Sequence, residues 1–295
     1  NDSIAMIVSG STVFTNSTVA GDVNDLAGGT YDGDDIISAE LGTFSSVTVA
    51  GQGGNDTITV TGEDAGANLI AGGTGNDAIT MQGTASATTT VAGGAGSDTV
   101  TFASGANTTL VMLGGDNDHL VISGKVDTAS GVVASTVFGG AGADRMLSGG
   151  SIESAGAGVD WTFGYSALTD STLAAMDTIA IGGATDSATY TFQYTPGGLT
   201  RATFSASGAT GTNGVVTFSG VDSDLTSRVN IVDAGLTTEG ETTIFKDSNN
   251  VDYLFISGGS SGTSDDLIVR IGTAGTASNG TLTLAGGKTI TVNLA

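Results

Sequence analysis

The feature that most restricts the fold of this chain is an aspartate that returns at a nearly constant interval, each time behind a glycine-rich turn. The intervals between successive aligned aspartates are 21, 21, 21, 20 and 26 residues. Spacing this regular does not arise from low-complexity drift and indicates a structural repeat. The six segments are "TYDGDDIIS" from Thr30, "GQGGNDTIT" from Gly51, "GGTGNDAIT" from Gly72, "GGAGSDTVT" from Gly93, "LGGDNDHLV" from Leu113 and "GGAGADRML" from Gly139, and their aspartates are Asp35, Asp56, Asp77, Asp98, Asp118 and Asp144.

Apolar residues keep the same register as the aspartates. The residue two positions after the aspartate is always apolar, and the residue seven positions before it is Val or Ile in five of the repeats. Because side chains alternate between the faces of a strand, each period carries two short strands that turn aliphatic residues inward. Stacked units of this kind predict an all-β fold, a right-handed parallel β-solenoid over residues 25–150. Residues 1–24 are expected to be an N-terminal strand, a cap or a linker.

The glycine-Asp turn is chemically demanding in such a stack. Equivalent turns lie about 4.8 Å apart, so stacked carboxylates repel one another unless something neutralises them. Glycines permit left-handed backbone angles that turn peptide carbonyls toward the gap. Carbonyl and carboxylate oxygens from two turns then form a cage of about six hard ligands, which suits Ca²⁺ better than Mg²⁺ or a transition metal. The alternative is a metal-free stack in which the Asp side chains cap the turns.

Two segments, "GGTGNDAIT" and "GGAGSDTVT", resemble in full the nonapeptide of the RTX (repeats-in-toxin) family, and the other four depart from it at one or more positions. The resemblance implies an RTX β-roll-like stack with a single row of Ca²⁺ ions along one edge, about five in the gaps between six turns. The residues it implies as ligands are Asp32, Gly33, Asp35, Gly51, Gly53, Asp56, Gly72, Thr74, Asp77, Gly93, Ala95, Asp98, Gly115, Asp116, Asp118, Gly139 and Asp144.

Composition narrows the possible partners. Asp and Glu number 30 against 7 Lys and Arg, giving a formal charge of −23, which argues against nucleic acid and anionic membranes and favours cations. Cys is absent, which excludes disulfides and thiolate sites. No apolar run reaches the roughly 18 residues of a membrane helix, so membrane insertion is not expected. No signal peptide is visible at the start, and we expect a mature fragment or the C-terminal part of a longer protein.

The motif disappears in residues 151–295, where short alternating segments predict an antiparallel β-sandwich-like domain or a stack that has lost its period. One helix is expected around Thr169 to Met176, a hairpin around Pro196-Gly197-Gly198, and further strands such as "SRVNIVD". The last part, about residues 250–295, resembles the C-terminal targeting region of bacterial proteins exported by type I secretion. That resemblance implies export without cleavage, and folding outside the cell when Ca²⁺ binds.

Catalytic signals are weak. The single His, His119, has no Cys partner and no nucleophile elbow, and no metalloprotease motif occurs, so an enzyme is not expected. We interpret His119 as a surface residue. Trp161, Phe163 and Tyr165 alternate as a sugar-stacking face would, although packing at the end of the repeats is the favoured interpretation.

Two functions follow from these features. The favoured one is a secreted structural protein, a bacterial surface layer (S-layer) or extracellular filament, whose partners are other copies of the chain, the type I secretion apparatus and possible cell-surface polysaccharide. Surface acids such as Asp222, Asp224, Asp265 and Asp266 are candidates for bridging Ca²⁺ between subunits. The alternative is the C-terminal RTX module of a larger secreted hydrolase or cytolysin, or an adhesin. The sequence upstream of residue 1 would discriminate between them.

Overall fold

The structure is a computed structural model of the 295-residue chain. It describes residues 1–7, 13–21, 33–64, 66–82, 89–104, 110–123, 135–148, 161–181, 189–219, 224–272 and 280–293. Within these residues the chain is nearly all β, with one α-helix and extensive parallel pairing, as the all-β prediction requires. It forms two compact units, one of Asn1–Phe138 and Leu147–Trp161 and one of Gly139–Met146 and Thr162–Ala295.

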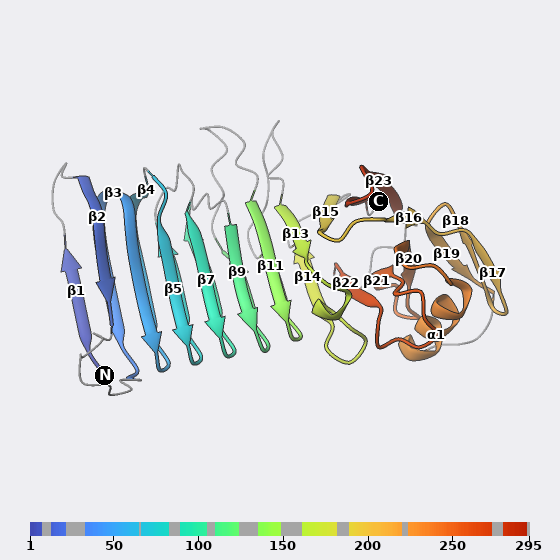
Figure 1. Ribbon diagram of the computed structural model, residues 1–295, viewed down its shortest axis with the longest axis horizontal. Coiled ribbons are helices and arrows are strands. Elements are labelled where there is room, and N and C mark those ends of the chain that lie inside the picture. Colours follow the sequence, from blue (N-terminus) through green and yellow to red (C-terminus); the bar gives the residue numbers. More distant parts are fainter. Residues whose placement is uncertain are drawn as a thin grey trace. The chain divides into compact units, whose positions relative to one another are not determined.

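The first unit holds two groups of parallel strands, and each 21-residue repeat supplies one strand to each group. In one group β3 pairs with β5, β5 with β7 and β7 with β9 (Figure 1). In the other, β3 pairs with β4, β4 with β6, β6 with β8 and β8 with β10. The strands are β1 (Ser3–Ile7), β2 (Val13–Ala20), β3 (Ile36–Gly53), β4 (Thr57–Asp64), β5 (Leu69–Thr74), β6 (Ala78–Gln82), β7 (Thr90–Ala95), β8 (Thr99–Ser104), β9 (Leu110–Gly115) and β10 (His119–Ile122).

The register stacks equivalent apolar residues from repeat to repeat. Ile58 lies opposite Ile79, and Ile70 lies opposite Val91. Burying a side chain of this size stabilises the fold by about 1.5–3 kcal/mol, so the columns supply much of the driving force for stacking. The predicted inward columns are confirmed, because every member has an exposed fraction of 0–3%: Ile37, Val49, Ile58, Ile70, Ile79, Val91, Val100, Val111, Leu120, Val137 and Met146.

Residues ahead of the six aligned segments continue the same array. β1 pairs in parallel with the first part of β3, where Ile4 lies opposite Ile37. β2 pairs in parallel with the later part, where Val19 lies opposite Val49. Part of the segment expected as a strand, cap or linker therefore consists of two strands in register with the repeats.

The second unit combines antiparallel and parallel pairing. Antiparallel groups are formed by β20, β21 and β22, by β15, β24 and β23, and by β17, β18 and β19. Parallel pairs join β13 to β15, β14 to β22 and β16 to β20, so a purely antiparallel arrangement describes only part of this unit. The strands are β14 (Asp177–Ile181), β15 (Thr189–Tyr194), β16 (Thr200–Arg201), β17 (Phe204–Ala206), β18 (Ala209–Thr212), β19 (Val215–Phe218), β20 (Glu241–Lys246), β21 (Asp252–Ile256), β22 (Leu267–Ile271), β23 (Thr281–Ala285) and β24 (Thr289–Asn293), while β11 (Ser135–Ala141), β12 (Arg145–Ser148) and β13 (Trp161–Tyr165) lie where the chain passes between units.

Two local predictions for this half are wrong. The helix expected around Thr169 to Met176 is a single 3₁₀ turn at Leu168–Asp170. "SRVNIVD", expected as a strand, lies within α1 (Leu225–Gly235). The Asp224 carboxylate caps α1 by accepting the backbone N–H of Ser227 at 2.8 Å, and the buried Val229 and Val232 lie three residues apart. Capping and this helical spacing outweigh the preference of β-branched residues for strands.

The expected hairpin around Pro196 is also wrong, since its flanking strands pair elsewhere: β15 with β13 and β24, and β16 with β20. The main apolar cluster of the second unit lies between α1 and the strands around β20 and β21. In it the rings of Phe245 and Tyr253 stack with their centroids 5.2 Å apart.

No helix in the described part of the chain is both long and apolar enough to cross a membrane.

Candidate metal centre

The aspartates that follow the glycine turns are buried, although aspartate is an ionisable side chain. Each lies one residue before a strand, ahead of β3, β4, β6, β8 and β10. Their exposed fractions are only 1–2%. The repeat therefore stacks carboxylates inside the first unit as an aspartate column, which consists of Asp35, Asp56, Asp77, Asp98 and Asp118.

One oxygen of each carboxylate is used by the backbone of the preceding repeat. The backbone N–H of Asp56 donates to Oδ1 of Asp77 at 2.8 Å, and that of Asp77 donates to Oδ1 of Asp98 at 2.8 Å. The same bond joins Asp35 to Asp56 at 2.7 Å and Asp98 to Asp118 at 2.7 Å. Oδ1 thus has the turn-capping role that was the alternative to metal binding, and the side chain still has a second oxygen.

In the repeats of Asp56, Asp77 and Asp98, that second oxygen points at a glycine five residues earlier. A Cβ atom built on Gly72 would lie 2.2 Å from Oδ2 of Asp77 and 2.6 Å from the carbonyl oxygen of Gly93. The same two kinds of oxygen converge against Gly51 and against Gly93. In Asp35, Asp77 and Asp98, Oδ2 is buried and accepts no hydrogen bond from the described residues. A buried carboxylate oxygen beside a carbonyl oxygen fits a hard cation such as Ca²⁺.

Four other expected ligands, Gly53, Thr74, Ala95 and Gly115, lie at the ends of strands that pair between repeats. The carbonyl oxygens of Thr74 and Ala95 accept the backbone N–H groups of Gly54 and Gly75, at 2.9 and 2.8 Å. Gly53 and Gly115 occupy the equivalent register position in their own repeats. The carbonyl oxygens of Thr74 and Ala95 therefore take part in strand pairing, and each has a second lone pair with which it could bind an ion.

The remaining predicted ligands are Gly139 with Asp144, Asp116, Gly33 and Asp32. Gly139 packs against Oδ2 of Asp144, just as the glycines of other turns pack against Oδ2 of the aspartate in their own repeat. Asp116 is exposed and adopts a φ of 71° where other repeats have glycine, so the turn survives this departure from the motif. The carbonyl oxygen of Gly33 lies against Gly54 of the next repeat. Asp32 lies outside the described residues.

The backbone of Asp2, which the alignment of the repeats missed, continues the hydrogen-bond pattern ahead of the aspartate column. The backbone N–H of Asp2 donates to Oδ1 of Asp35, and the backbone N–H of Ile36 donates to the carbonyl of Asp2 at 2.9 Å. These are the bonds that later repeats make. The signal was present in "NDSIAM", which matches "NDTITV" after Asn55, but the interval to Asp35 is 33 residues rather than 21.

The second unit contains a shorter version of the same arrangement. The backbone N–H of Asp144 donates to Oδ1 of Asp177 at 2.9 Å, and both side chains are fully buried. Asp177 was also missed, because it stands in "MDTIAI", which lacks the glycines and again follows at 33 residues. The backbone N–H of Asp177 donates to the Ser171 hydroxyl at 2.9 Å, so here a neutral oxygen takes the place of a carboxylate.

A second row of polar side chains runs beside the column on the exposed side of the turns. The backbone N–H of Asn76 donates to the side-chain oxygen of Asn55 at 2.7 Å, and that of Ser97 donates to Asn76 at 2.7 Å. Asp34 accepts the N–H of Asn55 in the same way at 2.7 Å. The residue before each aspartate therefore supports the stack without adding a buried charge.

Burial perturbs the titration of these carboxylates. Desolvation, together with the charge of Asp98, raises the pKa of Asp77 to about 6, although the bond from the Asp56 backbone opposes the shift. Desolvation and the neighbouring Asp144 charge raise the pKa of Asp177 to about 8. The folded chain therefore disfavours these charges unless a proton or a cation compensates them.

A pH dependence follows for the protein in chelator. A carboxyl whose pKa is raised on folding stabilises the fold fully below its unfolded value near 3.8, and this stability is lost as pH rises through the folded value, about 6 for Asp77 and about 8 for Asp177. We expect the melting temperature in chelator to fall between pH 5 and pH 8, and to stay nearly level with millimolar CaCl₂, as measured by calorimetry. Equal slopes in the two buffers would contradict neutralisation by Ca²⁺.

Other candidate residues have structural surroundings. Phe163 and Tyr165 are buried, and the ring of Phe163 lies 5.9 Å from that of Phe192, so these two are not an exposed sugar-stacking face. His119 is half-buried at the start of β10 and lies opposite Thr99 of β8. The described residues contain no group of three or more His, Cys, Asp or Glu side chains placed to hold one metal ion.

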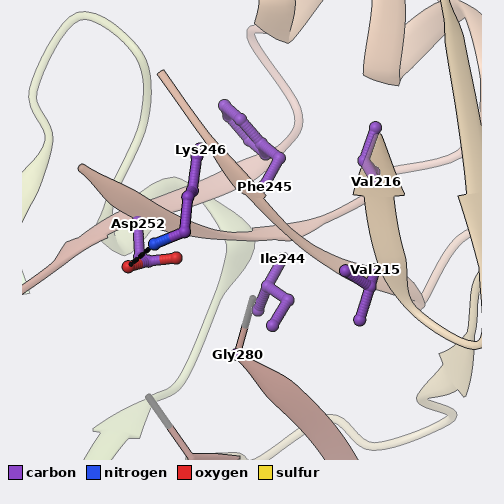
Figure 2. A pocket seen from close by; sticks show the side chains of 7 residues that line it. All are labelled: Val215, Val216, Ile244, Phe245, Lys246, Asp252 and Gly280. Atoms are coloured by element: carbon purple, nitrogen blue, oxygen red, sulfur yellow. Dashed lines mark hydrogen bonds and ion pairs between the residues drawn. The ribbon is translucent and has the colours of Figure 1, made fainter. Parts of the chain in front are cut away.

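A small hollow in the second unit contains one ion pair. Figure 2 shows Lys246 pointing to Asp252 among the apolar side chains of Val215, Ile244 and Phe245. The Lys246 Nζ lies 2.7 Å from the Asp252 Oδ2. Both side chains are largely buried, so the pair satisfies a charge inside the unit rather than presenting one to a ligand.

No protein-family profile matches the chain, and a search of curated proteins gives no match either. The aspartate column and its glycine contacts are therefore the basis for a functional proposal.

Proposed function

We propose that the chain is a secreted structural protein whose repeats form a right-handed parallel β-solenoid that Ca²⁺ stabilises. The observation that carries the proposal is the buried Oδ2 of Asp35, Asp77 and Asp98, which accepts no hydrogen bond from the described residues. The antiparallel groups of the second unit support a sandwich-like arrangement there as part of the same proposal.

The ion's role in this proposal is electrostatic. Bound Ca²⁺ supplies positive charge between carboxylates that otherwise repel one another. For every column aspartate except Asp118, Oδ2 of the aspartate and the carbonyl oxygen of the turn in the next repeat are the protein ligands, because these atoms converge against the same glycine. Leu113 replaces that glycine in the repeat of Asp118, so this convergence is lost there.

Export from the cell explains why the chain carries so many carboxylates. Where Ca²⁺ is scarce, as inside a cell, the uncompensated carboxylates oppose compaction and keep the chain extended for a type I secretion apparatus. Outside, millimolar Ca²⁺ binds the folded chain only, and its binding free energy becomes folding free energy. The resemblance of residues 250–295 to a type I targeting region supports this order of events.

A structural rather than catalytic role is supported by the regularity of the outer surface. Thr59, Thr80 and Thr101 lie in register on one side of β4, β6 and β8, facing away from the apolar columns. A surface that repeats at each strand suits repeated contacts between copies of the chain, as in a surface layer or filament. Cell-surface polysaccharide is the proposed anchor.

Assembly is tested on the purified chain. Adding millimolar CaCl₂ to chelated protein is expected to produce particles much larger than a monomer by light scattering, and an ordered array by electron microscopy. MgCl₂ at equal ionic strength is the control. Folding that stops at the monomer would contradict the surface-layer proposal and favour the alternative, an RTX module of a secreted hydrolase or cytolysin, or an adhesin.

A further inference from the structure

Two buried carboxylates of the second unit are hydrogen-bonded by the same loop, away from the glycine-Asp turns. Asp266 precedes β22 and its exposed fraction is 0%, whereas Asp233 belongs to α1 and its exposed fraction is 7%. The sequence analysis took Asp266 as a surface acid, and this is wrong. Desolvation raises the pKa of Asp266 to about 7, and the charges of Asp233 and Asp265 add to the shift although the hydrogen bond from the Gly258 backbone opposes it.

The loop between β21 and β22 holds one oxygen of each buried carboxylate. The backbone N–H of Gly258 donates to Oδ1 of Asp266 at 2.9 Å. The backbone N–H of Gly262 donates to Oδ2 of Asp233 at 2.9 Å. Both carboxylates are therefore fixed in place by the same loop.

The other oxygen of each carboxylate has no such bond. Oδ2 of Asp266 and Oδ1 of Asp233 are buried, and neither has a hydrogen-bond partner among the described residues. A buried carboxylate oxygen without a hydrogen bond is strongly unfavourable, and the charges of these two carboxylates also repel each other. Such a pair requires a proton or a cation.

We infer that Asp233 Oδ1 and Asp266 Oδ2 are ligands of a Ca²⁺ site that is independent of the repeats. The carboxylate of Asp265 adds negative charge beside it, since Oδ2 of Asp265 lies close to Gly258 of the same loop. An all-oxygen environment selects a hard cation, and Ca²⁺ tolerates irregular ligand sets that include backbone carbonyls and water. The site ties the end of α1 to the β21–β22 loop.

Counting bound ions tests this site. We expect Asp266→Asn and Asp233→Asn each to bind one Ca²⁺ fewer than the wild-type chain by native mass spectrometry in CaCl₂. Glu239→Gln is the matched control, because it removes an exposed carboxylate from the same unit and Glu239 has no part in the proposed ion binding. This control is expected to bind as many ions as the wild type. Equal counts in all four proteins would overturn the inference and leave Asp266 as a carboxyl kept neutral by burial.

Ion counts also distinguish the site of Asp233 and Asp266 from ion binding by the repeats. If the repeats bind no ion, the wild type binds one Ca²⁺ and Asp266→Asn binds none. If only the repeats bind, Asp77→Asn lowers the count and Asp266→Asn does not. Should the Asp233 and Asp266 variants fail to fold, crystals of the wild-type chain soaked in Tb³⁺ decide: an anomalous peak between the two carboxylates supports the site, and its absence there overturns it.

Discussion

Replacing Gly94 by alanine is expected to destabilise the protein in millimolar CaCl₂ by about 3 kcal/mol. Gly94 has a φ of 127°, a region that L-residues rarely enter. A Cβ atom there would lie 2.0 Å from the carbonyl oxygen of Gly73 in the neighbouring strand. Gly94 is paired on both sides, with Gly73 and Gly114, so the backbone cannot move away. Thermal or urea unfolding measures the change.

Gly115→Ala is the matched control for this substitution. Among the described residues, no atom beyond the two chain neighbours lies within 4 Å of a Cβ built on Gly115, and Ala95 already occupies the equivalent position one repeat earlier. Its stability should change by less than about 0.5 kcal/mol. Gln52 fills the Gly94 position in an earlier repeat, but at a φ of 82°, closer to the left-handed helical region that other residues can enter. Similar stability of the two alanine variants would contradict this expectation, because it would show that the neighbouring strand leaves room for a Cβ atom at Gly94.

Substitutions of Asp77 are expected to separate its two roles. Asp77→Ala removes the acceptor of the buried Asp56 N–H and should cost about 1–3 kcal/mol with or without Ca²⁺. Asp77→Asn keeps a side-chain oxygen for that N–H but removes the charge. It should therefore be more stable than the wild type in chelator at pH 8, by about 1 kcal/mol, and less stabilised by CaCl₂.

Calorimetry of the three proteins in chelator and in CaCl₂ checks this pattern. The informative quantity is the gain in melting temperature when CaCl₂ replaces chelator. If Asp77→Asn gains as much as the wild type, Asp77 binds no ion. If Asp77→Ala is as stable as the wild type in both buffers, the bond to the Asp56 backbone contributes little.

Much of the first unit is predictable because its signals are local and repeated. The residue two after each aspartate is apolar, as is the residue seven before it in five of the six repeats, and a strand can bury only alternate residues, so Ile58 and Ile70 had to face inward. The 21-residue interval then fixed which residues stack. The two oxygens of each aspartate were harder to assign, since a spacing does not tell whether a carboxylate caps a backbone N–H, holds an ion or does both.

The sequence misled where a repeat lacked its usual spacing or where local signals conflicted. Asp2 and Asp177 each stand 33 residues from the neighbouring aspartate, outside the interval on which the alignment depended. In α1 the alternation of Val229, Ile231 and Asp233 imitates a strand, whereas the Asp224 cap and the burial of Val229 and Val232 favour a helix. Asp266 looked like a surface acid because its burial depends on long-range packing that no short window contains.

The central claim, that Ca²⁺ neutralises the aspartate column and thereby folds the chain, is tested most directly by far-ultraviolet circular dichroism during heating. One sample is measured at neutral pH in chelator and again after millimolar CaCl₂ is added. The account predicts much less β-structure and melting at a far lower temperature in chelator, and full β-structure with cooperative melting in CaCl₂. Full β-structure and the same cooperative melting in both conditions would contradict it.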